Sequence, residues 1–288
     1  MAYFMSFLNK PINNENFSIL CNLLFDELIS KIPTPTLDIH APVLIRSRPN
    51  DDMNLFSEEW QISYNSRCPE KINPGRFNSP RQPMFYACAP GETSETNDLR
   101  LTSCLESDKS ILSERNTKPI QYFTSGIWHI QKPLKVINLC YNENLMIANP
   151  TMKENVNAFI KEIYNIFPSA SAPFIIEFWK FICDLAAKKD EIGSEHFLST
   201  AFSTATFAYY REVMKKELDG IVYSSPVTKN YGINIVLNPN VVDTFLSLKS
   251  VYMIKFERDK NNSKLYDIGI CSKEVAVTNG KFELTIDY

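Results

Sequence analysis

The chain has 288 residues, of which 44% are hydrophobic and 22% are charged, and its formal net charge is -3. This composition is that of an ordinary globular protein and excludes collagen-like, coiled-coil and mostly disordered classes. The length predicts one or two domains with a large hydrophobic core. The acidic balance argues against direct binding of nucleic acid, because neutralising phosphates requires a basic face.

Seven cysteines stand at wide spacings, and none belongs to a CxxC pair. An odd number of isolated cysteines is typical of free thiols, so we expect no disulfide framework, no metal site and a cytoplasmic location. The first residues lack the basic stretch and the small-residue cleavage site of a signal peptide. The most apolar segment, residues 172–187, is interrupted by Glu177, Lys180 and Asp184, which indicates a buried helix rather than contact with a membrane.

In chain order, the first predicted element is a helix over residues 14–32, ended by Pro33 and Pro35 because proline cannot continue a helix. Strands are predicted at 42–48 and 83–89, on either side of a loop-like stretch rich in Asn, Pro and Ser.

The next predicted elements are a helix around 99–112, a strand at 133–139, and helices at about 151–167, 173–188 and 194–218. After Gly220 the pattern returns to strands, at 220–225, 234–238, 250–259, 265–272 and 281–288. This order predicts an α+β fold rather than an alternating βαβ array. We expect an N-terminal helical segment, residues 1–40, and one domain, residues 41–288, with a helical insertion at about 151–218.

The common catalytic motifs are absent: the sequence holds no GxGxxG, no Walker A loop, no HExxH and no GxSxG. Instead, three segments combine arginines, aromatic residues and hydroxyls. Arg46 and Arg48 alternate along a predicted strand and should therefore face one side. Residues 74–86 read PGRFNSPRQPMFY, and residues 219–226 read DGIVYSSP.

Taken in this order, these segments resemble the RES-domain family. Its members are bacterial toxins, usually encoded with an Xre-type antitoxin, whose fold is related to that of ADP-ribosyltransferases. The resemblance covers about residues 42–245 and rests on Arg46 in LIRSR, Arg76 and Tyr86 in GRFNSPRQPMFY, Glu106 in RLTSCLES and Ser225 in DGIVYSS. The sequence departs from the family pattern at Arg81, where the family usually has glycine, and at Ser224, where it usually has proline.

The resemblance implies an ADP-ribosyltransferase-like core, with a mixed or antiparallel sheet, and cleavage of the bond between nicotinamide and ribose in NAD. It implies the catalytic residues Arg46, Glu106 and Ser225 and the NAD-binding residues Arg48, Arg76, Tyr86 and Ser224, without a metal. These residue types suit the reaction, because a guanidinium presents a fork of donors to pyrophosphate and an aromatic ring offers a flat face to a base. A carboxylate stabilises the oxocarbenium-like ribose.

Several alternatives remain open at this stage. The group that accepts ADP-ribose could be water, inorganic phosphate or a macromolecule, and the protein could also be an inactive NAD-binding module. Glu92, Glu95 and Glu114 are alternatives to Glu106 as the acidic residue. Taken singly, each residue of the constellation also has a structural interpretation, such as a solvated strand face or core packing. The resemblance further implies an antitoxin partner, and the sequence leaves a homo-oligomer open.

Overall fold

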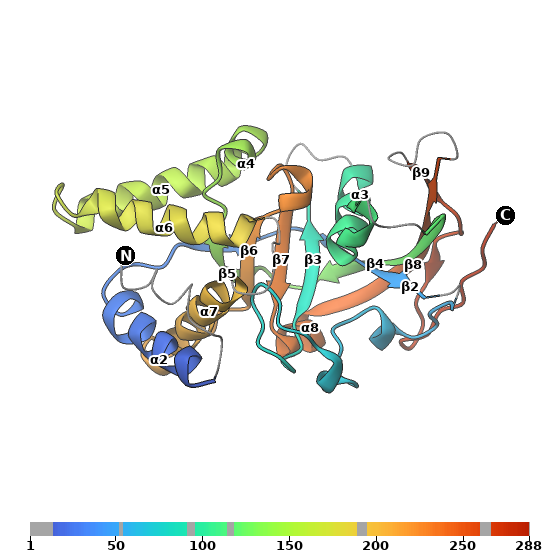
Figure 1. Cartoon of the computed structure of the whole chain (residues 1–288), viewed down its shortest axis with the longest axis horizontal. Coiled ribbons are helices and arrows are strands. Elements are labelled where there is room, and N and C mark those ends of the chain that lie inside the picture. The colour runs from blue at the N-terminus through green and yellow to red at the C-terminus, as the bar shows by residue number, and fades with distance from the viewer. Residues whose placement is uncertain are drawn as a thin grey trace.

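The structure, a computed structural model, describes residues 14–51, 54–90, 96–113, 118–188, 195–259 and 266–287. Within these residues the chain has an α+β fold, in which helices pack against one large and mostly antiparallel sheet (Figure 1). The predicted fold class is therefore confirmed. No helix in the described ranges has the length and apolar character needed to cross a membrane.

The sheet contains ten strands within the described residues, and its order is β1-β5-β6-β7-β3-β2-β4-β8-β10, with β9 also paired to β8. The strands are β1 (Thr36–Ile39), β2 (Val43–Asn50), β3 (Phe85–Ala89), β4 (Ile120–Ile130), β5 (Leu134–Leu139), β6 (Gly220–Ser224), β7 (Ile233–Leu237), β8 (Leu246–Arg258), β9 (Tyr266–Ile270) and β10 (Val275–Ala276). Only the β5–β6 pair is parallel, and α4 to α7 form the crossover that connects these two strands, as parallel pairing requires.

The helices begin and end where the sequence supplies caps and prolines. They are α2 (Asn14–Leu24), which continues as a π-helix (Phe25–Ile29), α3 (Thr96–Ser107), α4 (Glu143–Ala148), α5 (Pro150–Ile166), α6 (Ala172–Ala187), α7 (Glu195–Glu212) and α8 (Pro239–Phe245). Asn149 caps α5 by accepting from the Met152 N–H, and Pro150 follows at the first helical position. Short 3-10 turns lie at Glu59–Gln61, Pro69–Lys71, Lys109–Leu112 and Pro226–Thr228.

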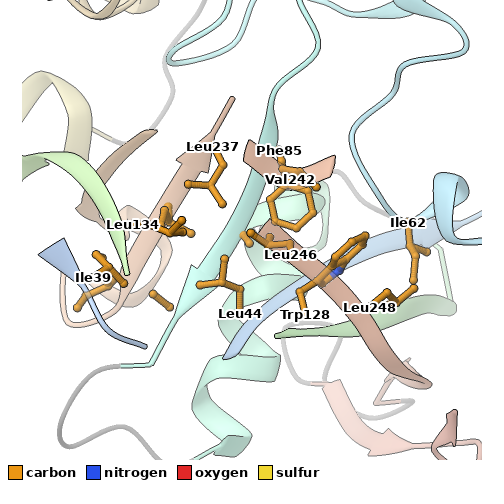
Figure 2. Packing of buried hydrophobic residues seen from close by; sticks show 14 of the residues in the cluster. Ile39, Leu44, Ile62, Phe85, Trp128, Leu134, Leu237, Val242, Leu246 and Leu248 are labelled. Atoms are coloured by element: carbon orange, nitrogen blue, oxygen red, sulfur yellow. The ribbon is translucent and has the colours of Figure 1, made fainter. Parts of the chain in front are cut away.

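Both faces of the central strands are buried. On β7, Ile233, Ile235 and Leu237 join one core cluster, while Val236 joins a second cluster with α2, α6 and α7. The first cluster is shown in Figure 2, where Phe85 and Trp128 meet edge to face with ring centroids 5.0 Å apart. Because each face is covered, these strands are nearly continuous apolar runs rather than alternating ones.

The sheet opens between β2 and β3. These two strands pair at a single position, Ile45 with Cys88, whereas β2 pairs with β4 along eight residues. Helix α3 lies over this junction, with Leu99 packed on Ile45 and Cys88. In Figure 1, α3 lies near β3, while α6 and α7 lie toward β5 and β6. The space between these helices is where a site can form.

Several element predictions were wrong in detail. The structure adds β1, β4, β10, α4 and α8, which the sequence pattern did not predict, and α7 ends at Glu212 rather than near residue 218. Residues 281–287 do not form a strand of the sheet. They make isolated bridges to residues outside the named strands: Lys281 with Glu58 and Thr278, and Ile286 with Ser272. The division into residues 1–40 and 41–288 stays a prediction.

Candidate active site

A cavity of about 270 Å³ lies between α3, the start of α7 and the face formed by β3, β6 and β7. The side chains at its wall that can bind or catalyse are Arg46, Arg76, Tyr86, Glu106, His196 and Asn234. Four of these, Arg46, Arg76, Tyr86 and Glu106, are residues of the sequence-predicted constellation. A volume near the lower end for ligand pockets fits one half of a dinucleotide rather than the whole molecule.

Glu106 is fixed at the sheet side of the cavity. It stands in the last turn of α3, and its Oε1 accepts hydrogen bonds from Ser225 Oγ at 2.6 Å and from Asn234 Nδ2 at 2.7 Å. Ser225 follows β6 and is fully buried. The sequence-predicted pair of Glu106 and Ser225, 119 residues apart in the chain, is therefore brought into direct contact.

A row of three side chains runs across the sheet beneath Glu106. Asn234 on β7 pairs with Tyr223 on β6 and with Cys88 on β3, so the three residues share one face. Cys88 Sγ donates to Asn234 Oδ1 at 3.3 Å. Burial raises the pKa of the Tyr223 hydroxyl well above its usual range, with the nearby Glu106 carboxylate adding to the effect. The floor of the cavity is therefore neutral and hydrogen-bonding.

Arg46 enters the cavity where β2 and β3 separate. Its Nε donates to Ile62 O at 3.1 Å, its Nη1 donates to Tyr86 O, and its guanidinium stacks over the Phe85 ring at 5.2 Å. A guanidinium has five N–H donors, so three stay available for a ligand. Burial, with the nearby Arg48 adding to the effect, lowers the pKa of Arg46 to about 9, yet the side chain remains a cation at neutral pH.

The loop that carries Arg76 is held by the hydroxyl of Tyr86. Tyr86 Oη accepts from the Phe77 N–H at 3.0 Å and donates to Asn78 Oδ1 at 2.8 Å. A Cβ on Gly75 would lie 2.3 Å from Asn78 Oδ1 and 3.2 Å from Tyr86 Oη, so only glycine fits this close approach. Tyr86 thus combines a ring at the cavity with a hydroxyl that shapes the neighbouring loop.

Arg76 connects this loop with the helical block. Its Nη1 donates to Leu185 O at 3.3 Å, its guanidinium lies 5.6 Å from the centre of the Tyr223 ring, and the residue is 5% exposed. Its own carbonyl accepts from Ser199 Oγ at 2.6 Å, in the second turn of α7. Helix α7 therefore helps to position Arg76 and also contributes His196 to the cavity wall.

Two residues of the predicted binding set are not part of the cavity wall. Arg48 projects from the same face of β2 as Arg46, as predicted, but its Nη1 donates to Gln61 O at 2.7 Å and its guanidinium stacks beside Phe56. Ser224 is fully buried, and its Oγ donates to Asn230 Oδ1 at 3.3 Å. The rival acidic residues Glu92, Glu95 and Glu114 lie outside the described residues.

Arg81 occupies the position where the RES-domain pattern usually has glycine, and its backbone conformation is one that favours glycine. Arg81 has φ of 66°, in the left-handed region that glycine adopts at the lowest cost. Its N–H donates to Ile72 O at 3.1 Å, which closes the turn before β3. An arginine therefore takes the conformation for which a glycine would be better suited.

The prediction missed Asn234 and His196. A signal for Asn234 was present, because it interrupts the apolar strand Ile233–Leu237, and a buried amide needs a partner. His196 gave no such signal, since its role depends on where α7 begins relative to the sheet. Within the described ranges, no three His, Cys, Asp or Glu side chains gather as metal ligands would, and all seven cysteines are free thiols.

No family model matches this sequence, and no curated protein matches it significantly. The chemistry of the site must therefore be argued from its geometry. Two guanidinium groups in one cavity favour an anionic ligand such as a pyrophosphate, while a fixed carboxylate in the same cavity can stabilise a developing positive charge.

Proposed function

We propose that the protein cleaves the bond between nicotinamide and ribose in NAD, releasing nicotinamide and transferring ADP-ribose to inorganic phosphate or water. One observation carries this proposal: Glu106 is anchored by Ser225 and Asn234 in the same cavity that receives Arg46, Arg76 and Tyr86. Arginines for a pyrophosphate, an aromatic ring for a base and a carboxylate for a cationic ribose are the groups that this reaction needs.

In the proposed mechanism, Arg46 and Arg76 bind the pyrophosphate and Tyr86 packs its ring against the nicotinamide. Nicotinamide carries a positive charge in NAD and leaves as a neutral molecule with the bonding electron pair, so no acid needs to protonate it. The ribose left behind is oxocarbenium-like, and the Glu106 carboxylate stabilises its charge. Attack of phosphate or water on the anomeric carbon then completes the transfer, and the nucleophile's proton passes to solvent or to Glu106.

The proposal includes the setting in which such an enzyme works. Free thiols at all seven cysteines fit a reducing compartment, and we place the protein in the cytoplasm, where NAD is available. From the resemblance to the RES-domain family, we also propose an antitoxin encoded beside it.

The test is direct measurement of nicotinamide released from NAD by the purified protein. Glu106→Gln keeps the size of the side chain and removes its charge, and we expect kcat to fall by about 100-fold or more, the scale of losing one transition-state stabiliser. Glu143→Gln, an exposed glutamate in the first turn of α4, is the matched control and should leave turnover unchanged. A wild-type protein that releases no nicotinamide would overturn the proposed function.

Product analysis identifies the acceptor in the same experiment. With phosphate in the buffer, the product expected is ADP-ribose-1″-phosphate, and without it ADP-ribose. Label from NAD that appears on a protein or nucleic acid, with little free ADP-ribose, would instead identify a mono-ADP-ribosyltransferase. Binding of NAD without any product would identify an inactive module.

A further inference from the structure

We propose that Asn234 is a positioning residue for Glu106, and that the Cys88 thiol fixes the orientation of the Asn234 amide. This inference rests on the proposed function of the same cavity and adds two residues to it. Cys88, Asn234 and Glu106 form a chain of hydrogen bonds from β3 through β7 to the last turn of α3.

The hydrogen bonds in this chain have only one consistent direction. A carboxylate accepts and cannot donate, so the Asn234 atom 2.7 Å from Glu106 must be the Nδ2 donor. The Asn234 Oδ1 then faces Cys88 Sγ at 3.3 Å, where it can only accept. Burial raises the pKa of the Cys88 thiol well above its usual range, with Glu106 contributing, so the sulfur keeps the proton that it donates.

The sheet holds this chain rigidly. Cys88 and Asn234 are register partners on β3 and β7, and Asn234 is 2% exposed, so its side chain has little freedom to turn. Glu106, by contrast, comes from a helix that ends one residue later, at Ser107. A functional group is held accurately by neighbours whose own rotamers are locked by packing and hydrogen bonds, and Asn234 is such a neighbour for the Glu106 carboxylate.

Both bonds from the sheet end on the same carboxylate oxygen. Ser225 Oγ and Asn234 Nδ2 donate to Oε1, and this arrangement leaves Oε2 for a ribose hydroxyl or for the charge that develops at the anomeric carbon. If Asn234 is removed, Ser225 alone cannot fix the rotation of the carboxylate. The loss should then appear in kcat rather than in KM for NAD, because the arginines that bind the pyrophosphate are unchanged.

The first test compares Asn234→Leu with Asn138→Leu. Asn138 is also a buried sheet asparagine, 6% exposed, but it lies on β5 and its Oδ1 accepts from the Cys140 N–H. We expect Asn234→Leu to lower kcat for nicotinamide release by about 10- to 100-fold, the effect of losing one hydrogen bond to a charged group. KM should stay within about 3-fold, and Asn138→Leu should retain kcat.

The second test uses Asn234→Asp, which has nearly the same shape. The introduced carboxyl can donate to Glu106 only while it holds a proton, and two neighbouring carboxylates cannot easily ionise together. Activity of Asn234→Asp should therefore approach the wild-type value at low pH and fall as pH rises, whereas Asn234→Leu stays low throughout. The other titratable groups at this cavity wall are Arg46 on β2, Tyr86 and Cys88 on β3, Arg76 in its loop, His196 on α7 and Tyr223 on β6. Wild type contains all six, so its own pH profile is the reference.

The third test concerns the thiol. Cys88→Ser keeps a donor to Asn234 Oδ1 and should preserve kcat within about 2-fold, while Cys88→Ala removes it and should lower kcat by about 3- to 10-fold, the range for a neutral hydrogen bond. Equal kcat in the serine and alanine variants would overturn the role of Cys88.

A readout without NAD separates this inference from the proposed function. The thermal midpoint of Asn234→Asp, relative to wild type, should fall as pH rises, because the pair is stable only while it shares a proton. If wild type releases no nicotinamide, the proposed function fails, and this pH-dependent shift still shows whether Asn234 contacts Glu106. A flat difference in midpoint, or full kcat in Asn234→Leu, would overturn the positioning role.

Discussion

The hydroxyl of Tyr86 offers the sharpest test of how the cavity is built. Tyr86→Phe keeps the ring at the cavity and deletes only the oxygen that the Phe77 N–H and Asn78 contact. Phe77 and Asn78 are 2% and 4% exposed, so water cannot readily replace this oxygen. The change therefore separates the function of the ring from the structural function of the hydroxyl.

The loss of stability expected for Tyr86→Phe follows from the two hydrogen bonds that the Tyr86 hydroxyl makes. Each neutral hydrogen bond contributes about 1 kcal/mol, and leaving a buried N–H without an acceptor costs about 1–3 kcal/mol, so we expect Tyr86→Phe to lower the free energy of unfolding by about 2–4 kcal/mol. For a chain of this length that corresponds to a thermal midpoint lower by roughly 3–7 °C.

The assay is urea unfolding followed by circular dichroism, with Tyr64→Phe as the matched control. Tyr64 also donates through its hydroxyl, to Asp243 at 2.6 Å, but this contact is exposed, so its loss should cost less than about 1 kcal/mol. Equal losses in the two variants would refute the conclusion that the Tyr86 hydroxyl holds the loop carrying Arg76.

Three further outcomes are expected. Arg81→Gly should raise the free energy of unfolding by about 0.5–1 kcal/mol in the same assay. The reason is that the strain of arginine at φ of 66° exceeds the entropy that glycine adds to the unfolded chain. A destabilised variant would contradict this prediction. In the folded protein, Cys68 should react first with a thiol reagent at about pH 8. The other partly exposed cysteine is Cys21, and burial raises its pKa to about 12. An unchanged labelling rate in Cys68→Ser would show that Cys68 is not the first thiol to react. Burial raises the pKa of Asp184, and Glu177 adds to the effect, so the charged form is disfavoured in the folded state. Asp184→Asn should therefore stabilise the protein at neutral pH by about a few tenths of a kcal/mol, and the gain should vanish as pH falls and the wild-type carboxyl becomes protonated; a gain that is independent of pH would contradict the cause.

The sequence predicts helices and strands well where interactions between neighbouring residues determine them. The helix predicted at about 151–167 forms as α5, although its cap is Asn149 rather than the expected Thr151. The β-branched residues of Ile233–Leu237 produce β7. Strand β4 escaped prediction because its middle, Thr124, Ser125 and Gly126, reads as a loop. Thr124 and Ser125 are fully buried only because Asn50 and Ser47 on β2 hydrogen-bond them, contacts of high sequence separation.

The segment 281–287 shows the opposite case, in which a correct pattern led to a wrong element. Phe282 and Leu284 alternate along the chain and are 7% and 4% exposed, so the predicted burial holds. Alternation reports which side of an extended segment is buried but does not report whether a neighbouring strand is available to pair with it. Here the segment packs on the core and makes only isolated bridges, to residues that lie outside the strands of the sheet.

Alternation also placed Arg46 and Arg48 on one face but could not say which of them reaches the cavity. That choice depends on where β2 and β3 separate, at Ile45 and Cys88. Beyond this pair, Arg46 Nη1 donates to the Tyr86 carbonyl, whereas Arg48, two residues further on, contacts Gln61 O and the Phe56 ring outside the cavity wall. Register between distant segments is thus the information that local sequence lacks.

Asn234 shows how a single sequence, without a related protein for comparison, can still point to a contact between distant segments. Burying an amide in the middle of an apolar strand is unfavourable unless both of its polar atoms find partners. Asn50 and Asn138, also buried in the sheet, bond backbone groups and a threonine hydroxyl and so have a purely structural explanation. Asn234 differs because its donor meets a carboxylate at a cavity wall. A lone asparagine inside a strand of β-branched residues is therefore a reason to look for a charged partner, whatever family a sequence resembles.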